Sequence, residues 1–348
     1  MLEQVFLPRG ASPFEDVWNL LQASGYLDEK PDGSLQLAKA DAEKSWNKIK
    51  DGSDISYDIV VKRPEGLVGT GSVIRIYSGT WLMHQLATLK GQKLRYEVAR
   101  DIYFDTVGFQ LNNPAQEFLM AFYNASWKWH RRLFENFITT YCSQNEGAIA
   151  HWVHFDLRSK CGGLPPNFRI VELIGEGRPP VENPVLQRAM DYGVGLGEVS
   201  QVYHRCGLER RRHVYSLVNR GEEFAEIHCE FATPGLNIFN LLNQVRVRLF
   251  KHDEESMALA LSATSKIYRE QGIEEVVFLA DENQAPLVGA EIAKKICELK
   301  QIVIVKKRLQ DFYNYLCEVL RDPSQLRSKG RSRGSSTGKS RTSFLPLR

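Results

Sequence analysis

The sequence predicts an α/β protein in which two mixed sheets, one in each half, are flanked by helices and followed by a disordered, basic C-terminal tail. One order of elements (helices, three strands, helix, strand, helix, strand) is predicted twice along the 348 residues. In each half, short turns join β-branched runs, a pattern typical of an antiparallel meander. The repeat distance of roughly 150 residues indicates duplication of a whole domain, because repeat arrays have periods of only about 20 to 50 residues.

The first half opens with helices and continues with the meander. A proline at the start and an apolar stripe predict a helix from Pro13 to Ala23, and a second helix is expected from Leu37 to Ile49. Three strands should follow: Ser56 to Lys62, Leu67 to Tyr77 and Thr80 to Leu89. A helix, a strand, a helix and a strand complete this half: Gln92 to Phe109, Glu117 to Tyr123, Trp127 to Tyr141 and Ile149 to Leu157.

Glycine and proline concentrate in residues 159–184, which predicts a linker there. The second half is expected to contain helices over about 185–207 and three strands, Arg212 to Asn219, Glu222 to Phe231 and Asn237 to Leu249. The remaining predicted elements are a helix Glu254 to Gln271, a strand Glu275 to Leu279, a helix Val288 to Lys300, a strand Ile302 to Val305 and a helix Lys307 to Leu320. We therefore expect domains at 1–158 and 185–321. Residues 322–348 are rich in Ser, Gly, Arg and Lys, and should be disordered.

The composition excludes a fibrous protein and a wholly disordered one. Apolar residues make up 43% of the chain and charged residues 25%, which is ordinary for a globular protein. No apolar run approaches the ~20 residues that span a bilayer, so we expect no membrane partner. The N-terminus lacks the pattern of a secretory signal, which favours a cytoplasmic location. The six cysteines form no CxxC pair, which argues against a zinc site and a disulfide framework.

The distribution of charge argues against nucleic acid as a partner. The net charge is +3, but residues 327–348 alone carry seven Lys or Arg and no acid, so the rest of the chain is slightly acidic. Nucleic-acid binding needs a shaped basic face rather than a basic tail. The densest basic cluster of the folded part, Arg205 with Arg210, Arg211 and Arg212, is either a solvated rim or a contact for an anion.

This order of elements resembles that of the GNAT superfamily of N-acetyltransferases, over about residues 10 to 158 and again over 185 to 320. The resemblance implies that the third meander strand leads into a loop and a helix N-terminus that hold the pyrophosphate of acetyl-CoA or another acyl-CoA. It also implies that the fourth and fifth strands diverge, with the acyl thioester between them.

A narrower resemblance rests on Thr80-Trp81-Leu82-Met83-His84-Gln85-Leu86-Ala87 with Ser24-Gly25-Tyr26 upstream. This combination is similar to the GNAT-like part of bacterial proteins that carry a PilZ cyclic-dinucleotide domain. Arg327-Ser328-Lys329-Gly330-Arg331 has the spacing of a PilZ RxxxR motif, but the seventeen residues that follow are too few to build that domain.

The phosphate loop of GNAT enzymes reads Q/RxxGxG/A, because backbone with small side chains must approach phosphate closely. The first half has Thr88-Leu89-Lys90-Gly91-Gln92-Lys93 at this place, with one glycine. Lys90, Gly91 and Lys93, together with Gln85, are therefore the candidate cofactor-binding residues; the alternative is an ordinary turn with solvated lysines. The second half has no glycine here and two acids, Asp253 and Glu254, which would repel a pyrophosphate.

The candidate catalytic residues are His84 and Asn124. A general base must take a proton from an amine, and His84 lies on the third strand, where such a base is expected. The alternative is a buried, hydrogen-bonded histidine, because His84 shares a strand face with leucines. Asn124 matches the asparagine that many GNAT enzymes place after the fifth strand. The helical tyrosine that serves as their general acid is missing, since the nearest residue is Phe134; Tyr123 and Tyr141 are substitutes.

Two functions follow from these residues. The first is a non-catalytic regulatory protein that uses a degenerate, duplicated GNAT-like fold to bind a small molecule or a protein partner. It is favoured by the poor phosphate loops and the missing tyrosine. The second is an acyl-CoA-dependent N-acyltransferase with its site in the first half, around His84, Gln85, Gly91 and Asn124. It is favoured by the order of elements and by Asn124.

Overall fold

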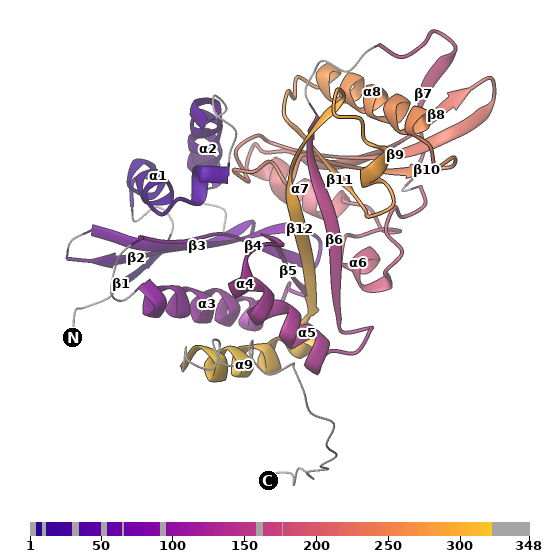
Figure 1. Cartoon of the computed structure of the whole chain (residues 1–348). Helices are drawn as coiled ribbons and strands as arrows, with labels where there is room; N and C mark the ends of the chain where they lie inside the picture. Colours follow the sequence, from indigo (N-terminus) through magenta and orange to yellow (C-terminus); the bar gives the residue numbers. More distant parts are fainter. Residues whose placement is uncertain are drawn as a thin grey trace, which may run out of the picture.

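A computed structural model describes residues 5–8, 12–29, 35–49, 54–64, 66–90, 95–157, 163–175 and 177–321 of the chain. Gly91, Lys93, the RxxxR sequence and the basic tail from residue 322 lie outside these residues. Within them, all strands belong to a single sheet of twelve strands in the order β1-β2-β3-β4-β5-β12-β6-β11-β10-β9-β8-β7 (Figure 1). The two predicted sheets are therefore continuous with each other.

The elements of the first half follow the prediction closely. Its meander is antiparallel, and the strand after the first long helix pairs in parallel with the edge of that meander. The bounds are β1 Val5–Pro8, α1 Phe14–Ala23, η1 Tyr26–Glu29, α2 Leu35–Ile49, β2 Ser56–Arg63, β3 Gly66–Tyr77, β4 Thr80–Thr88, α3 Arg95–Asn112, β5 Phe118–Asn124, α4 Lys128–His130, the π-helical η2 Arg131–Glu135, α5 Asn136–Tyr141 and β6 Gly147–Leu157.

The second half repeats this arrangement. An antiparallel meander of β8, β9 and β10 is followed by a helix and by a strand, β11, that pairs in parallel with β10. The bounds are β7 Phe168–Glu172, α6 Pro184–Ala189, α7 Gly197–Arg205, β8 Arg210–Asn219, β9 Glu222–Ala232, β10 Gln244–Leu249, α8 Glu254–Glu270, β11 Val276–Ala280, η3 Ala285–Leu287, β12 Ala293–Val305, η4 Lys306–Arg308 and α9 Leu309–Arg321. Both halves have the GNAT-like topology, so the chain has a tandem GNAT-like fold.

Three sequence predictions are wrong. Most of the predicted helix from Val288 to Lys300, residues 293–300, is instead the first part of one long strand, β12, that runs on through Val305. The third strand of the second meander begins at Gln244 rather than at Asn237. The predicted linker 159–184 contains a strand, β7, paired with β8. Lys, Glu and Leu favour a helix in β12, but the strand lies between two others, and such tertiary pairing overrides local propensity.

The last strand of each half pairs with the other half. β12, from the C-terminal half of the sequence, lies antiparallel between β5 and β6, while β6, from the N-terminal half, pairs with β11. Figure 1 shows the two long strands side by side, crossing from one part of the molecule to the other. Each half therefore contributes a strand that completes the sheet of the other. A division at residues 158 and 185 into units that fold alone stays a prediction.

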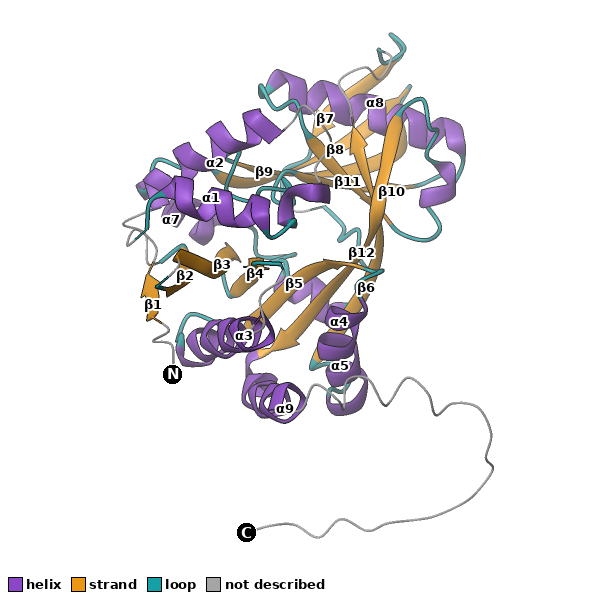
Figure 2. Cartoon of the chain, turned by 60° about the vertical axis from the view of Figure 1, so that its left-hand side comes forward, coloured by secondary structure: helices purple, strands orange, loops and turns teal. Residues whose placement is uncertain are grey.

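Helices cover both faces of the first half of the sheet. Helices α1 and α2 lie on one face of β2, β3 and β4, and α3 and α9 lie on the other (Figure 2). Because α9 follows β12, this C-terminal helix packs on the first half: Phe312 is buried against Phe134 and Phe137, with ring centroids 5.6 and 4.9 Å away. The Tyr96 hydroxyl of α3 donates a hydrogen bond to the Leu320 carbonyl at 2.7 Å.

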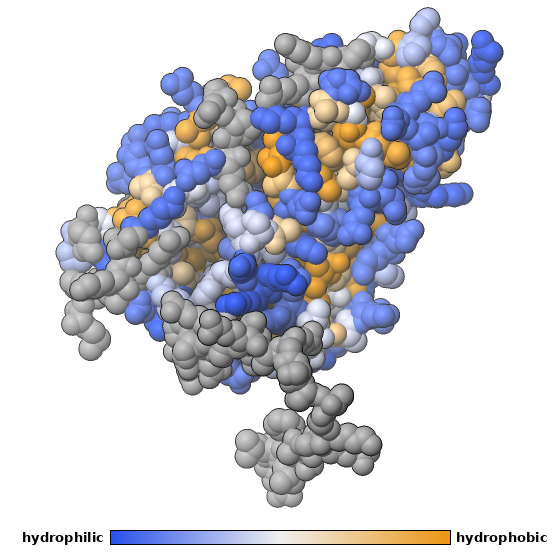
Figure 3. All heavy atoms as spheres, viewed as in Figure 1, coloured by the Kyte–Doolittle hydropathy of each residue, from blue (hydrophilic) through white to orange (hydrophobic). Residues whose placement is uncertain are grey.

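The junction between the halves is also a hydrophobic core. One contiguous cluster joins side chains of β3, β4 and β5 to those of α6 and α7, among them Ile74, Ile76, Leu82, Val185 and Val199. On the opposite face of the second half, α8 covers the alternate residues of β9 and β10, such as Ile227 and Val247. The face of the molecule in Figure 3 is covered mostly by hydrophilic residues, with smaller hydrophobic areas between them. No helix among the described residues is long and apolar enough to cross a membrane.

The exchange of strands predicts that a core substitution in α9 destabilises the first half of the protein. Replacing Phe312 by Ala should lower the free energy of unfolding by about 3–5 kcal/mol, because a fully buried aromatic side chain is lost and a cavity remains. Urea denaturation followed by tryptophan fluorescence measures this change. Glu318→Ala, at an exposed position of the same helix, is the control and should change the free energy by less than about 0.5 kcal/mol. Equal effects of the two variants would contradict the packing of α9.

Candidate functional site

The first half has the divergence of strands that the GNAT resemblance implies. β4 and β5 pair in parallel from Thr80 opposite Phe118 to Met83 opposite Ala121, and the pairing then stops. Just past this point Gln85 has a φ of 55°, in a bulge where the register of β4 on β3 shifts. We call the region between β4 and β5 beyond Met83 the first wedge. A bulge beside an opening sheet is a common way to aim side chains and backbone groups at a site.

The backbone group of the bulge is already bonded to the chain itself. The N–H of Gln85 donates a hydrogen bond to the hydroxyl of Tyr26 at 3.1 Å. Tyr26 comes from η1, which directly follows α1, and its ring also contacts Phe239 of the second half, with centroids 5.2 Å apart. The structure thus places Gln85 at the wedge, with its backbone N–H bonded to a tyrosine; its role in binding a cofactor stays a prediction.

His84 is the last member of a polar row that crosses three strands. Asp58 of β2, Ser72 of β3 and His84 of β4 are successive cross-strand neighbours. The Ser72 hydroxyl donates to the carboxylate of Asp58, and it lies 3.0 Å from Nε2 of His84. Because that hydroxyl donates to Asp58, it accepts from Nε2–H, which leaves the lone pair of the imidazole on Nδ1. The ring is oriented for chemistry, but the residue is only 9% exposed.

The remaining predicted residues of the first half are engaged elsewhere. The side-chain oxygen of Asn124 accepts hydrogen bonds from the N–H and the hydroxyl of Ser126, at 3.0 and 2.8 Å, and so stabilises the turn after β5. Lys90 pairs with Asp28 at 3.1 Å on the surface. His84, Gln85 and Lys90 thus lie on or directly after β4, and Asn124 lies at the end of β5. The structure brings none of these four together in a hydrogen bond.

The two tyrosines that were considered as a general acid lie in different surroundings. Tyr123 donates a hydrogen bond from its hydroxyl to Glu135 at 3.0 Å. Burial and the nearby Glu135 carboxylate raise the pKa of Tyr123 well above its ordinary value. Tyr141 is exposed at the end of α5. Phe134, at the expected position, stacks on Tyr123 with centroids 5.9 Å apart and belongs to the core.

The second half has an equivalent opening, the second wedge, between β10 and β11 beyond Val245. Parallel pairing covers only Gln244 opposite Val277 and Val245 opposite Phe278. Odd-numbered residues of β10 direct their backbone groups toward β11, as the bond from the Val277 N–H to the Asn243 carbonyl indicates. The carbonyl of Val247 therefore faces the wedge, and it accepts a hydrogen bond from the side-chain amide of Gln284 at 2.6 Å.

The N-terminus of α8, the helix that follows β10, is capped by an acidic side chain of the chain itself. Asp253 is the N-cap of α8 and accepts a hydrogen bond from the N–H of Ser256 at 2.8 Å. A carboxylate in this position interacts favourably with the positive end of the helix dipole. The hydrogen bonds that Asp253 accepts from Lys251 and Ser256 lower its pKa to about 2. That this end of the second half repels a pyrophosphate stays a prediction.

The sequence did not identify the most heavily buried charges of the molecule, which lie on one face of the second meander. Alternation places six side chains on this polar face, which looks toward the first half: Glu226, His228, Glu230, Gln244, Arg246 and Arg248. The alternating polar residues in EIHCE and QVRVR were the available signal. Charged side chains normally mark the solvated face of a strand, and here Tyr77 and Trp152 of the first half lie against Glu230 and Arg246.

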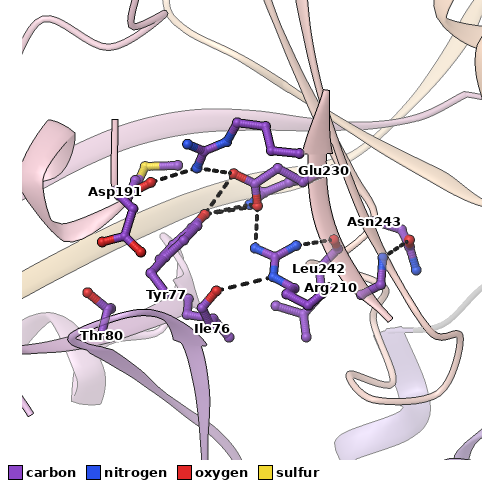
Figure 4. Close-up of polar contacts among 12 residues, drawn as sticks. Ile76, Tyr77, Thr80, Asp191, Arg210, Glu230, Leu242 and Asn243 are labelled. Carbon is purple, nitrogen blue, oxygen red and sulfur yellow. Dashed lines mark hydrogen bonds and ion pairs between the residues drawn. The ribbon is translucent and has the colours of Figure 1, made fainter. Parts of the chain in front are cut away.

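A buried cluster of charges joins the two halves at this polar face (Figure 4). The Glu230 carboxylate accepts hydrogen bonds from Arg210 at 2.5 Å, from Arg212 at 2.9 Å and from the hydroxyl of Tyr77 at 2.9 Å. Tyr77 belongs to β3 of the first half, and Arg210 also donates to the Ile76 carbonyl at 3.2 Å. The interpretation of Arg210 and Arg212 as a solvated rim is wrong, because both guanidinium groups are buried.

The electrostatics of this cluster hold Glu230 ionised. Burial alone would raise the pKa of Glu230, but Arg210, Arg212 and Arg246 outweigh burial and hold the pKa well below its ordinary range. Two more polar contacts connect the halves nearby: the Ser78 N–H donates to Asp191 at 2.6 Å, and the Thr80 hydroxyl donates to the Ala189 carbonyl at 2.5 Å. Among the described residues, no cluster of His, Cys, Asp and Glu has the composition and geometry to hold a metal ion.

Comparison with known proteins identifies similar solved structures. No protein-family model matches the chain, and no curated protein matches it. A tandem GNAT protein from the clavulanic acid biosynthesis pathway is 14% identical, with a TM-score of 0.45 over 87% of this chain and 99% of its own. A GCN5-related N-acetyltransferase from Sphaerobacter thermophilus is 13% identical, with a TM-score of 0.45 over 88% and 97%. A putative acetyltransferase from Thermoplasma acidophilum is 12% identical, with a TM-score of 0.43 over 86% and 99%. Likeness at this level does not assign an activity to this chain.

The charge cluster predicts a pH-dependent stability. Replacing Glu230 by Gln should lower the free energy of unfolding by about 3–5 kcal/mol at pH 7, because it leaves buried arginines without their carboxylate. A lowered pKa in the folded state stabilises the protein above the unfolded pKa of about 4.3, and this stabilisation is lost as the pH falls below that value. The difference between the wild type and Glu230→Gln should therefore shrink at low pH.

Urea denaturation of both proteins between pH 3 and pH 8 measures this difference. Glu226→Gln is the matched control, because Glu226 lies on the same strand face and pairs with Arg248 at 3.4 Å, near the edge of the polar face. It should cost less than Glu230→Gln at pH 7. A constant difference between wild type and Glu230→Gln across the pH range would contradict the ionised state of Glu230.

Proposed function

We propose that this chain is a non-catalytic protein that binds a small molecule or a protein partner through a duplicated, degenerate GNAT-like fold. One observation carries the proposal: in both wedges, a backbone group of the inner strand is bonded to a side chain of this chain. Tyr26 accepts from the Gln85 N–H in the first wedge, and Gln284 donates to the Val247 carbonyl in the second. In the GNAT family this region holds the acyl thioester, which would have to displace these side chains here.

The surroundings of the wedges support the same proposal. Lys90, a candidate for holding phosphate, is paired with Asp28, and the side-chain oxygen of Asn124 is used by Ser126. In the second half, the N-terminus of α8 is capped by Asp253. A regulatory role in a bacterial cytoplasm, as implied by the resemblance to the GNAT-like part of PilZ-associated proteins, is part of this proposal.

The direct test is binding and turnover of acyl-CoA. A ligand present at 100 times its dissociation constant stabilises a protein by about 2.7 kcal/mol, which raises the melting temperature by several degrees. We expect no such shift with acetyl-CoA or longer acyl-CoAs, and no release of free CoA thiol in the presence of a panel of amines. Acyl transfer by the wild type that is abolished in His84→Ala would overturn the proposal.

A second candidate function, N-acyl transfer in the first half, is favoured by the row of Asp58, Ser72 and His84. This row fixes the tautomer and the orientation of an imidazole beside the first wedge, as a general base requires. If the chain transfers acyl groups, His84→Ala should lower kcat by about 10²–10⁴-fold. Ser72→Ala should lower kcat by less, because it removes only the group that orients the ring.

Steady-state kinetics with acetyl-CoA and the best amine substrate would measure these effects. Ser216→Ala is a control, because Ser216 is a buried serine of the second meander that donates to Glu223 at 3.2 Å. It should leave kcat unchanged. Equal kcat values for wild type and His84→Ala would exclude His84 as the base.

A further inference from the structure

Arg246 is a buried guanidinium that lacks the partners such a group normally has. The residue is 2% exposed and lies on β10, directly after the last pair between β10 and β11. Among the described residues it makes one hydrogen bond, to the side-chain oxygen of Gln301, which is long at 3.5 Å, and its Nε–H has no acceptor there. Its guanidinium carbon lies 5.0 Å from the centre of the Trp152 ring. Within the part of the chain that the structure describes, no carboxylate forms an ion pair with Arg246.

The described carboxylates near Arg246 are bonded to other groups. Arg210, Arg212 and Arg246 all act on Glu230, whose carboxylate is bonded to the first two. The other acids of this region are bonded elsewhere: Asp191 accepts from the Ser78 N–H, and Glu226 pairs with Arg248. Among the described residues, the Glu230 carboxylate accepts hydrogen bonds from Arg210 and Arg212 and none from Arg246.

The neighbour of Arg246 on β9 is His228, and the two are cross-strand partners. His228 is 1% exposed, near the backbone of Arg178 and the ring of Tyr192. Burial, together with the charges of Arg212 and Arg246, lowers the pKa of His228 to about 3. The histidine is therefore neutral at physiological pH, and the positive charge at this place comes from the arginines.

A buried guanidinium needs acceptors. It carries five N–H donors, and leaving them unpaired in an interior costs several kcal/mol. Arginine pairs best with a carboxylate or a phosphate group, through two parallel hydrogen bonds. Unsatisfied buried polar groups in a native protein call for an explanation, of which a bound ion or molecule is one. The positive charge of the guanidinium specifies the sign of such a ligand.

The position of Arg246 in the fold is the second argument. Cross-strand register makes it the counterpart of His84: each is the first residue of its strand beyond the parallel pairs of its wedge. Its neighbour His228 is correspondingly the counterpart of Ser72, and Val214 that of Asp58. The same place in the two halves therefore carries a hydrogen-bonded row in one and, in the other, a guanidinium that forms no ion pair with a described residue.

We propose that the second wedge binds a small oxyanion, a carboxylate or a phosphate group, with Arg246 as its principal ligand and His228 beside it. This inference rests on the proposed binding function and names its ligand class. Arg246 would hold the anion through two N–H groups, with the Trp152 ring against the guanidinium and neutral His228 as a further hydrogen-bonding group. The ionised Glu230 keeps Arg210 and Arg212 occupied, so that Arg246 remains for the ligand.

The test is the response of thermal stability to anions in the full-length protein. Sodium phosphate and sodium acetate serve as probes, because a ligand that binds the folded state raises its stability with concentration. Each is titrated up to about 20 mM, with sodium chloride added to hold the ionic strength constant. We expect at least one of these probes to raise the melting temperature of the wild type. In Arg246→Met this rise in melting temperature should disappear, and the dissociation constant measured by calorimetry should increase at least tenfold.

Arg248→Met is the matched control, because Arg248 lies two residues along on the same strand face but is paired with Glu226. It should respond to the probe as the wild type does. Without added anion, Arg246→Met should melt at or above the temperature of the wild type, because it removes an uncompensated buried charge. Arg246→Lys keeps the charge and loses the planar fork, so it should bind several-fold more weakly than the wild type.

Three results would overturn this inference: no response of the wild type to either probe, an equal response of Arg246→Met, or a melting temperature of Arg246→Met below that of Arg248→Met. The first would indicate that water satisfies the guanidinium. The outcome is separable from that of the proposed function. Acyl transfer abolished by His84→Ala would overturn the non-catalytic function even with the anion response intact, and a missing anion response without acyl transfer would overturn the oxyanion site alone.

Discussion

The structure depends on one constraint, the insertion of β12 between β5 and β6. β5 is bonded along its length to a strand from the other end of the chain, and β6 is bonded to both β12 and β11. The two GNAT-like halves therefore share one sheet, and α9 covers the first half although it follows the second in sequence. Neither half can complete its sheet from the consecutive residues of its own segment.

The shared sheet determines which charges are buried. It holds the polar face of the second meander against β3, so that Tyr77 and the Ile76 carbonyl reach Glu230 and Arg210. Side chains that would be solvated on a free sheet become a buried network between the halves. Such a network is costly to desolvate and strongly destabilising to break, so it favours one relative arrangement of the two halves.

The two wedges have the same backbone geometry and different chemistry. In each, a parallel pair of strands separates after a few residues, and a side chain of the protein bonds to the backbone of the inner strand. The first wedge carries a hydrogen-bonded row of Asp58, Ser72 and His84. The second carries the buried guanidinium of Arg246. Duplication has kept the fold in both halves, and the side chains at equivalent positions have diverged.

The sequence by itself determined the type and order of most elements, because apolar periodicity and short turns act over neighbouring residues. It also placed Gln85 and His84 on the strand beside the first wedge. It could not predict β12 as a strand, because the residues from Ala293 to Lys300 favour a helix until strands on both sides supply hydrogen bonds. It could not predict the burial of Arg210, Arg246 or Glu230 either. Burial of a charge depends on which distant surface covers it, and here only the tertiary structure brings β3 over the second meander.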